Sequence, residues 1–310
     1  MDSLEFFCND ISKQTSAKGT FLFNCPEHLF LQSERGWKVY GLKQEGTKKI
    51  VAQIYINLNG KTGYSPLRAP FGSLELYTNV GYKNIKELFI KIEADLNKQR
   101  VGYLQIKNYP EVYHPKATKL LHKVLDELNY KSTNEVSSII SVDQQIFDRR
   151  IAISQRQKLR KSQNRFTVSQ AKQSDFKKVY NFITTCRKAK NQSLSMTFAQ
   201  LQRLNTVLSE NLILFSVGAE EQMAAAAIVI KVSEKILYTF YYAHDKIYNK
   251  ISPVVQLISG IYEYAQQHNF SMIDLGTSMI DGKINRSLIQ FKKSIGGTPS
   301  SKYIFEKTLS

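Results

Sequence analysis

The stretch from Asp274 to Gly297 constrains the fold of this chain more than any other segment. The apolar residues 271–275 predict a short strand that ends beside a carboxylate, and Gly276 breaks the strand. Asn285 suits the start of a helical turn, which closes at a double glycine. Because α/β folds place functional side chains where strands end in glycine-containing connections, we expect this stretch to carry part of a functional site.

Strand-like and helix-like runs alternate along the rest of the chain. We expect strands at residues 29–31, 37–42, 50–58, 101–106, 136–142, 167–171, 212–217, 223–232, 236–243, 271–275 and 303–305. We expect helices within residues 1–19 and at residues 82–99, 116–128, 144–165, 174–188, 197–208 and 253–267. This order predicts an α/β protein with mixed sheets, whose second half repeats the element order of the first.

The length of 310 residues allows two domains of ordinary size. We expect an N-terminal domain at residues 1–143, a basic connecting helix at residues 144–166 and a C-terminal domain at residues 167–310. The longest apolar run, residues 223–230, is far shorter than the roughly twenty residues of a membrane-spanning helix. A membrane span is therefore not expected.

The three cysteines are widely spaced and form no CxxC pair. This pattern argues against a disulfide framework or a structural zinc site and is typical of a reducing compartment. The first ten residues carry acids where a signal peptide would carry bases. We therefore expect a cytoplasmic protein.

The formal net charge is +17, which predicts attraction to phosphates, nucleic acid or acidic headgroups. Residues 149–172 contain eight bases and no acid. Such a run is either a solvated helix face or a surface that contacts phosphates. Stacking on single-stranded bases is poorly supported, because Phe166 is the only aromatic residue in the run.

Several short motifs occur in a characteristic order. They are Ala69–Gly72, Val142-Asp143, Gln157–Lys161, Tyr248-Asn249, Ser252-Pro253, Asp274–Gly276, Phe291-Lys292 and Gly296-Gly297. In this order they resemble the Gcn5-related N-acyltransferase (GNAT) superfamily, and the whole chain resembles its Fem-like branch (FemAB/FemX type). The resemblance implies two tandem GNAT-like domains. It also implies a transferase that moves an acyl or aminoacyl group from acyl-CoA or aminoacyl-tRNA to an amine acceptor, which in some relatives is a cell-wall precursor.

The predicted donor segment, residues 245–252, departs from the usual acetyl-CoA pattern. Standard acetyl-CoA enzymes of the superfamily carry a glycine-containing loop there, and this segment contains no glycine. Without glycine the backbone cannot approach phosphates as closely. Fem-like enzymes that use aminoacyl-tRNA also lack the loop, so tRNA is kept as a candidate partner. No permanently bound cofactor is expected.

The resemblance implies that Lys292, beside Phe291, stabilises the transition state of acyl transfer. The alternative is a core Phe291 next to a solvated Lys292. Asp274 is a candidate base or amine-orienting group, and the alternative is that it caps a turn. His244 and Asp245 are candidates for a proton shuttle, and the alternative is a surface turn.

Two further groups of residues are candidates for binding. Tyr248, Asn249 and Ser252 precede the 253–267 helix, whose N-terminus favours anions, and they form the predicted cofactor-binding set; Ser252 also suits a helix cap. The predicted substrate-binding set is Arg68, Phe71 and Gly72. Arg68 could pair with an acidic group of the acceptor or lie exposed, and the other two residues also suit a structural turn.

Several classes of chemistry find no motif in the sequence. The five histidines show no HxH or HxxxH spacing, so no metal site is proposed. No GxSxG elbow and no P-loop is present. The remaining alternative to an enzyme is a non-catalytic GNAT-like binding module that holds RNA or an acidic partner through its basic face.

Overall fold

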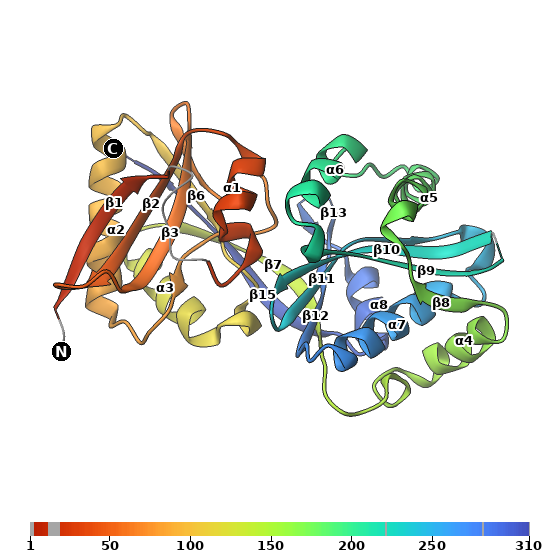
Figure 1. The fold of residues 1–310 in the computed structure, drawn as a ribbon. Coiled ribbons are helices and arrows are strands. Elements are labelled where there is room, and N and C mark those ends of the chain that lie inside the picture. Colours follow the sequence, from red (N-terminus) through yellow and green to blue (C-terminus); the bar gives the residue numbers. More distant parts are fainter. Residues whose placement is uncertain (1–2, 12–18, 221, 281, 310) are drawn as a thin grey trace. The chain divides into compact units, whose positions relative to one another are not determined.

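The computed structural model describes residues 3–11, 19–220, 222–280 and 282–309 (Figure 1). The chain forms two compact units: unit 1 is Met1–Val136 with Ser300–Ser310, and unit 2 is Ser137–Pro299. The predicted domains differ from these units at two places. Residues 144–166 lie inside unit 2, and the last strand belongs to unit 1 because it pairs with a strand of that unit.

Unit 1 is built on a mixed sheet with helices. Its elements are β1 (Leu4–Asp10), α1 (Pro26–Gln32), β2 (Trp37–Gln44), β3 (Ile50–Asn59), β4 (Thr62–Ser65), β5 (Glu75–Leu76), α2 (Tyr82–Lys98), β6 (Tyr103–Lys107), α3 (Pro115–Glu127), the start of β7 (Lys131–Ser141) and most of β15 (Thr298–Thr308). The strand order is β1-β2-β3-β4-β6-β15, with β5 beside β3. The β4–β6 pair is parallel and the other pairs are antiparallel.

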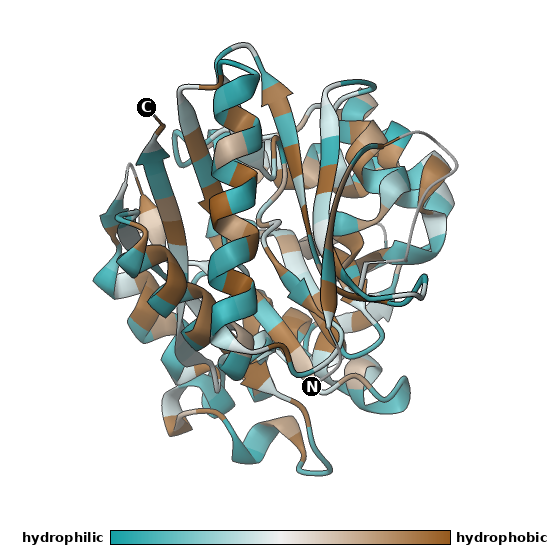
Figure 2. Cartoon of the chain, turned by 90° about the vertical axis from the view of Figure 1, so that its left-hand side faces the viewer, coloured by the Kyte–Doolittle hydropathy of each residue, from teal (hydrophilic) through white to brown (hydrophobic). Residues whose placement is uncertain are grey.

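The core of unit 1 follows from the spacing of apolar residues on α2. Ile85, Leu88, Phe89, Ile92 and Leu96 recur at helical intervals and are all fully buried. The helices that face the viewer in Figure 2 carry alternating hydrophobic and hydrophilic bands, as this spacing requires. The predicted helix at residues 82–99 is therefore confirmed.

Unit 2 repeats the mixture of sheet and helices. Its elements are the end of β7, α4 (Ile153–Gln163), β8 (Thr167–Gln170), α5 (Phe176–Lys188), α6 (Phe198–Val207), β9 (Leu212–Ala219), β10 (Gln222–Ser233), β11 (Ile236–His244), α7 (Pro253–Gln267), β12 (Met272–Thr277), β13 (Met279–Ile280), β14 (Lys283–Ile284) and α8 (Arg286–Ser294). The strand order is β7-β12-β11-β10-β9-β8, and only the β11–β12 pair is parallel.

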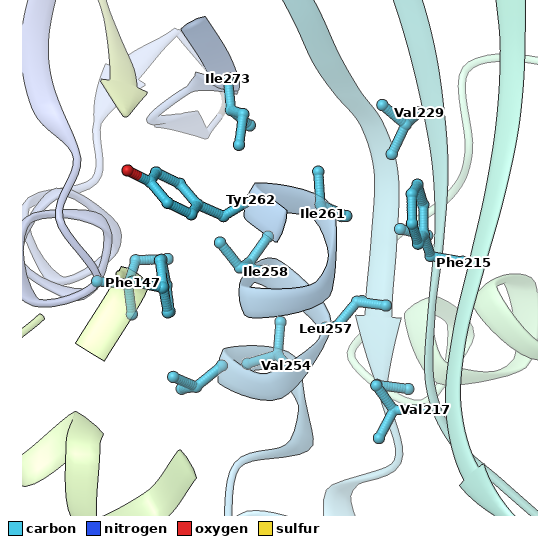
Figure 3. Close-up of a cluster of buried hydrophobic side chains, with 14 of the residues drawn as sticks. Phe147, Phe215, Val217, Val229, Val254, Leu257, Ile258, Ile261, Tyr262 and Ile273 are labelled. Carbon is cyan, nitrogen blue, oxygen red and sulfur yellow. The ribbon is translucent and has the colours of Figure 1, made fainter. Parts of the chain in front are cut away.

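Helix α7 is the centre of the unit 2 core. Val254, Leu257, Ile258 and Ile261 are almost completely buried and project toward the strands and Phe147 in Figure 3. Pro253 stands at the first helical position, where its missing N–H costs nothing. The predicted helix at residues 253–267 is confirmed to the residue.

The local predictions that fail lie near the N-terminus and in the connecting segment. A strand, β1, occupies residues 4–10 where a short helix was expected, and residues 12–18 lie outside the described residues. Residues 29–31 belong to helix α1, because Pro26 begins a helical turn there. Helix α4 covers only residues 153–163 of the expected 144–165.

Among the described residues, every helix is too short or too polar to cross a lipid bilayer. The described residues also contain no cluster of His, Cys, Asp or Glu side chains that could hold a metal ion.

Candidate functional site

A groove of about 840 Å³ lies in unit 2 where strands β11 and β12 part. The two parallel strands pair only between residues 236–238 and 272–274, although β11 continues to His244 and β12 to Thr277. The groove is lined by the diverging parts of both strands, with α5 and α8 contributing further side chains. The splayed strand pair therefore creates the groove.

Strand β11 gives the groove an aromatic wall. Tyr238, Phe240, Tyr242 and His244 all line it. The register between β11 and β10 passes from Thr239 to Tyr241 and skips Phe240, so the strand bulges at that residue. A bulge leaves a residue out of the ladder and re-aims its side chain, which is common beside functional sites.

Lys292 lies at the buried side of the groove. Its side chain is almost completely buried, and Nζ donates hydrogen bonds to the backbone oxygens of Gly276 at 2.7 Å and Thr277 at 3.0 Å. Both acceptors belong to the end of β12. A protonated Nζ has three N–H bonds, so one remains for a ligand in the groove.

The sequence around α8 fixes the position of Lys292. Asn285 caps the helix, as predicted, by accepting a hydrogen bond from the Leu288 N–H at 2.9 Å. At the other end, a Cβ on Gly297 would lie 2.8 Å from the Lys292 carbonyl oxygen, so only glycine fits without a shift. Gly276 has a φ of 75°, which also favours glycine.

The electrostatics of Lys292 follow from its burial. The pKa of Lys292 is lowered to about 8, mainly by burial; the Asp274 charge opposes this shift and the Arg187 charge adds to it. Asp274 is itself buried, and its Oδ1 accepts a hydrogen bond from the Gly276 N–H at 2.7 Å. Lys292 is therefore a cation at neutral pH that titrates near the working range of an enzyme.

The structure separates the three predicted catalytic residues. Phe291 and Lys292 line the groove together. Asp274 does not line it; this buried side chain holds Gly276 by a hydrogen bond and favours the charged form of the lysine. This placement suits a positioning role better than direct contact with a substrate.

The predicted cofactor-binding residues are also divided. Asn249 and Ser252 line the groove, and Asn249 Oδ1 lies 2.8 Å from His244 Nε2. Tyr248 packs into the core, with its ring against Phe166 and the Arg165 guanidinium over it at 5.0 Å. Tyr248 is thus a structural anchor of the segment.

The segment that precedes α7 uses its own backbone donors. Ser252 has a φ of 47°, and its side chain makes no capping hydrogen bond, contrary to the predicted cap. The amides that donate to oxygen atoms of this same segment are those of Ile247, Tyr248, Asn249, Ile251 and Ser252. These amides are not available to a phosphate group, which agrees with the absence of glycine.

The predicted substrate-binding residues Arg68, Phe71 and Gly72 belong to unit 1. Arg68 is exposed, whereas Phe71 is buried in a cluster of aromatic rings that includes Phe21 at 5.6 Å. A Cβ on Gly72 would meet the Pro66 nitrogen at 2.8 Å. Phe71 and Gly72 therefore have packing and turn roles, and only Arg68 offers a side chain to solvent.

The basic run at residues 149–172 serves several purposes. Arg156 donates to the Asp148 carbonyl oxygen at 3.0 Å, and Arg150 bonds the Tyr262 hydroxyl at 2.8 Å. Lys158 lines the groove, whereas Arg160 is exposed on α4. The run is therefore partly structural, and only part of it is a solvated face.

Sequence reasoning missed several residues of the groove. Arg187 lies in the last turn of α5 and Lys190 just after it, where bases also occur to complement the helix dipole, so their types gave no separate signal. The aromatic residues of β11 were expected in a strand, and their alternation could have indicated a wall.

No protein-family model matches the chain, and a search among curated proteins finds no match. Solved structures resemble it in fold. FemX matches with a TM-score of 0.68 at 13% sequence identity, over 93% of this chain and 92% of that chain. A tandem GNAT protein from the clavulanic acid biosynthesis pathway matches with a TM-score of 0.53 at 10% identity, over 99% of both chains.

A third similar structure is the C-terminal domain of a putative lysylphosphatidylglycerol synthetase from Agrobacterium fabrum. It matches with a TM-score of 0.53 at 9% identity, over 83% of this chain and 81% of that chain. These likenesses show that the chain has a Fem-like fold of tandem GNAT type, as the sequence predicted.

Proposed function

We propose that this protein transfers an acyl or aminoacyl group from an activated donor to an amine, with the reacting carbonyl held beside Lys292 in the groove of unit 2. The carrying observation is the buried Lys292 ammonium, which two strand-end carbonyls hold while the residue still faces the groove. The fold similarity to FemX and to a tandem GNAT protein supports the same reaction class.

Acyl transfer to an amine creates a charge that Lys292 is placed to meet. The neutral amine attacks the carbonyl carbon, a C–N bond forms, and the oxygen becomes an oxyanion. The C–O or C–S bond to the donor then breaks, and the proton that the amine loses ends on the departing alcohol or thiol. A fixed donor aimed at the oxyanion lowers the barrier most where water is excluded, and Lys292 is almost completely buried.

Asp274 and the end of β12 act through Lys292. The Asp274 charge raises the pKa of Lys292 against the effect of burial, so it helps to keep the ammonium charged. The Gly276 and Thr277 carbonyls orient the ammonium. Asp274 is thus a positioning residue in this proposal.

The donor is acyl-CoA or aminoacyl-tRNA. The Asn249–Ser252 end of the groove would face the donor, because it precedes the N-terminus of α7. The internally bonded amides of residues 247–249, 251 and 252 favour a donor that is not held by a phosphate cradle of the usual glycine-rich kind. Amine acceptors, including a cell-wall precursor, complete the reaction.

The test compares Lys292→Met with Lys293→Met, which removes an exposed charge from the neighbouring position on α8. Radiolabelled acetyl-CoA and aminoacyl-tRNA are offered with a panel of amines, and transfer is followed by mass and label. Loss of an oxyanion donor should lower kcat by roughly 10²–10³-fold in Lys292→Met, and Lys293→Met should retain activity.

Equal activity of the two variants would contradict the role of Lys292. If neither donor yields product with any amine, while the protein still binds RNA or an acidic partner, the non-catalytic binding module becomes the better description. Circular dichroism of both variants checks that the fold is intact.

A further inference from the structure

The walls of the groove carry charge of one sign. Lys158 of α4, Arg187 of α5, Lys190 just after α5 and Lys292 of α8 all line it. None of the described lining residues is an aspartate or a glutamate. A concave surface lined by one sign of charge concentrates ligands of the opposite sign. The groove is therefore suited to a substrate that carries negative charge.

Two hydrogen bonds hold the Arg187 guanidinium in place and leave other N–H donors of the group for a ligand. Its Nη1 donates to Gln192 Oε1 at 2.8 Å and its Nη2 to the Tyr242 carbonyl oxygen at 3.2 Å. A guanidinium carries five N–H donors in a rigid planar fork, so these two bonds orient it without using all of it. Since Arg187 also lines the groove, the oriented fork can serve a ligand there.

Arg187 lines the same groove as Lys292, the reacting centre proposed above. Burial is the main cause that lowers the pKa of Lys292, and the Arg187 charge contributes to the same shift. Tyr242 has a pKa raised to about 12 by burial, and the Arg187 charge acts against that shift. An anion bound at Arg187 would thus lie near the oxyanion that Lys292 is proposed to meet.

We propose that the acceptor is an amine that carries a carboxylate close to its amino group, as a free amino acid does, and that Arg187 and Lys190 bind this carboxylate. The proposal rests on the transfer reaction above and names its acceptor class. A carboxylate matches the planar fork of a guanidinium, which binds it through two parallel hydrogen bonds.

The donor is a poorer source of the anion at this place. The phosphates of acyl-CoA are a whole pantetheine arm away from the reacting carbonyl. In an amino acid, by contrast, the carboxylate shares a carbon with the amine. Arg187 and Lys292 line the same groove, so the anion that Arg187 binds is assigned to the group that reacts beside Lys292.

Cys186 offers a reporter that needs no transfer activity. It precedes Arg187 and lines the groove, whereas Cys8 and Cys25 lie in unit 1 and serve as internal references. The protein is treated at low ionic strength with an anionic or a cationic methanethiosulfonate of similar size. The rates are measured by mass spectrometry of the Cys186 peptide, and their ratio cancels the thiol pKa because both reagents attack the same thiolate.

The anionic reagent should modify Cys186 faster, and Arg187→Gln should lower the anionic-to-cationic ratio by about tenfold. Lys188→Gln is the matched control, since Lys188 is one residue away on α5, exposed and outside the groove lining. Lys190→Gln, at an exposed position, provides a second variant in case Arg187→Gln fails to fold. A ratio that falls no further in Arg187→Gln and Lys190→Gln than in Lys188→Gln overturns the proposal.

Protection distinguishes a carboxylate from a phosphate. Sodium acetate and sodium phosphate are added at equal ionic strength, with sodium chloride as the reference, and the neutral methyl methanethiosulfonate is the probe of Cys186. Acetate should slow the modification, and the effect should be lost in Arg187→Lys, which keeps the charge without the fork. Slowing by phosphate alone, or no slowing by acetate, would overturn the carboxylate site.

A comparison of two acceptor amines provides the last test, once transfer is observed. Glycine and glycinamide differ in the carboxylate and in the pKa of the amine, so the ratio of their kcat/KM values, each calculated per neutral amine, reports recognition of the carboxylate. Glycine should be preferred by the wild type, and the preference should disappear in Arg187→Gln. A preference for glycinamide overturns the proposal, whereas an absence of all transfer counts against the proposed function and leaves the Cys186 measurements readable.

Discussion

The charge of Lys292 determines what this residue can do. Its ammonium is almost completely buried and bonded to two backbone oxygens, and burial lowers its pKa to about 8. Below that pH it is a cationic hydrogen-bond donor, and above it a neutral amine that accepts a proton. The direction of the pH dependence therefore separates the two roles.

If protonated Lys292 stabilises the oxyanion, kcat for an acceptor amine whose own pKa lies well below 8 should fall as the pH rises through about 8. In Lys292→Arg the cation persists to a pH above about 12, so the fall near pH 8 should vanish even where the overall rate is lower. The measurement is the pH profile of kcat for both proteins. A wild-type rate that rises through pH 8 and levels off would instead identify Lys292 as a base.

At the scale of elements, periodicity predicted where helices and strands occur along the chain. The sequence could not predict where two neighbouring strands diverge. Helix α7 was expected at its observed bounds because Pro253 and its apolar spacing are local signals. The groove depends on β11 and β12 losing contact after Tyr238 and Asp274, and no residue type marks that point. The predicted Phe291-Lys292 pair lines the groove because local capping fixes the position of α8.

The same contrast explains the residues that changed role. Phe71 and Tyr248 belong to motifs that resemble functional segments, yet both side chains are buried in aromatic contacts. Arg187 carries no motif, and its place in the groove depends on the packing of α5 against β11, where it bonds the Tyr242 carbonyl. Tertiary packing thus decides which of several similar side chains faces a ligand.

Helix α7 approaches β8 closely through Gly260. A Cβ at this position would lie 2.4 Å from Cγ2 of Val168, a β-branched side chain with little rotamer freedom. Alanine has a helix propensity about 1 kcal/mol better than glycine, but overpacking costs typically about 1–3 kcal/mol. We therefore expect Gly260→Ala to lower the free energy of unfolding, as measured in urea.

A double substitution separates the two contributions. Gly260→Ala combined with Val168→Ala removes the clash, so the added alanine should then be neutral or stabilising relative to Val168→Ala alone. The coupling between the two positions is read from the double-mutant cycle. If Gly260→Ala stabilises the protein in both backgrounds, the close approach of α7 and β8 does not limit the packing.

At the scale of the whole molecule, the C-terminal strand connects distant parts of the sequence. Residues 304–308 of β15 pair with residues 103–107 of β6, and the Phe305 ring is buried in the core of unit 1. Lys302 and Lys307 form ion pairs with Glu135 and Glu93. The end of the chain therefore completes unit 1, although it follows unit 2 in sequence.

Deletion of residues 300–310 should accordingly weaken unit 1. Hydrogen exchange measured by mass spectrometry should show faster exchange in β6, α2 and α3, because their core loses Phe305 and β6 loses its partner strand. Protection of α7 and β10 should change much less. A loss of protection confined to residues 167–299 would instead support the sequence-predicted domain 167–310.

The net charge of +17 predicts binding to phosphates, and the exposed bases of α4 allow the most specific test of this prediction. Arg160 and Lys161 are exposed in the last turn of this helix, whereas Arg156 is bonded to backbone oxygens. If aminoacyl-tRNA is the donor and α4 contacts its duplex, each lost phosphate contact should reduce the slope of log K against log salt by about 0.9. The double change to glutamine should then flatten the slope by roughly 1.8.

The matched control removes the same charge elsewhere. Lys48 and Lys49 are neighbouring exposed bases in unit 1, and their change to glutamine lowers the net charge equally. Binding of unacylated tRNA is titrated at several salt concentrations for the wild type and both double variants. If only the α4 pair flattens the slope, α4 contacts the phosphates directly. Equal slopes in both variants would mean that the basic run is a solvated helix face, because a general field depends on the total charge and not on where it stands.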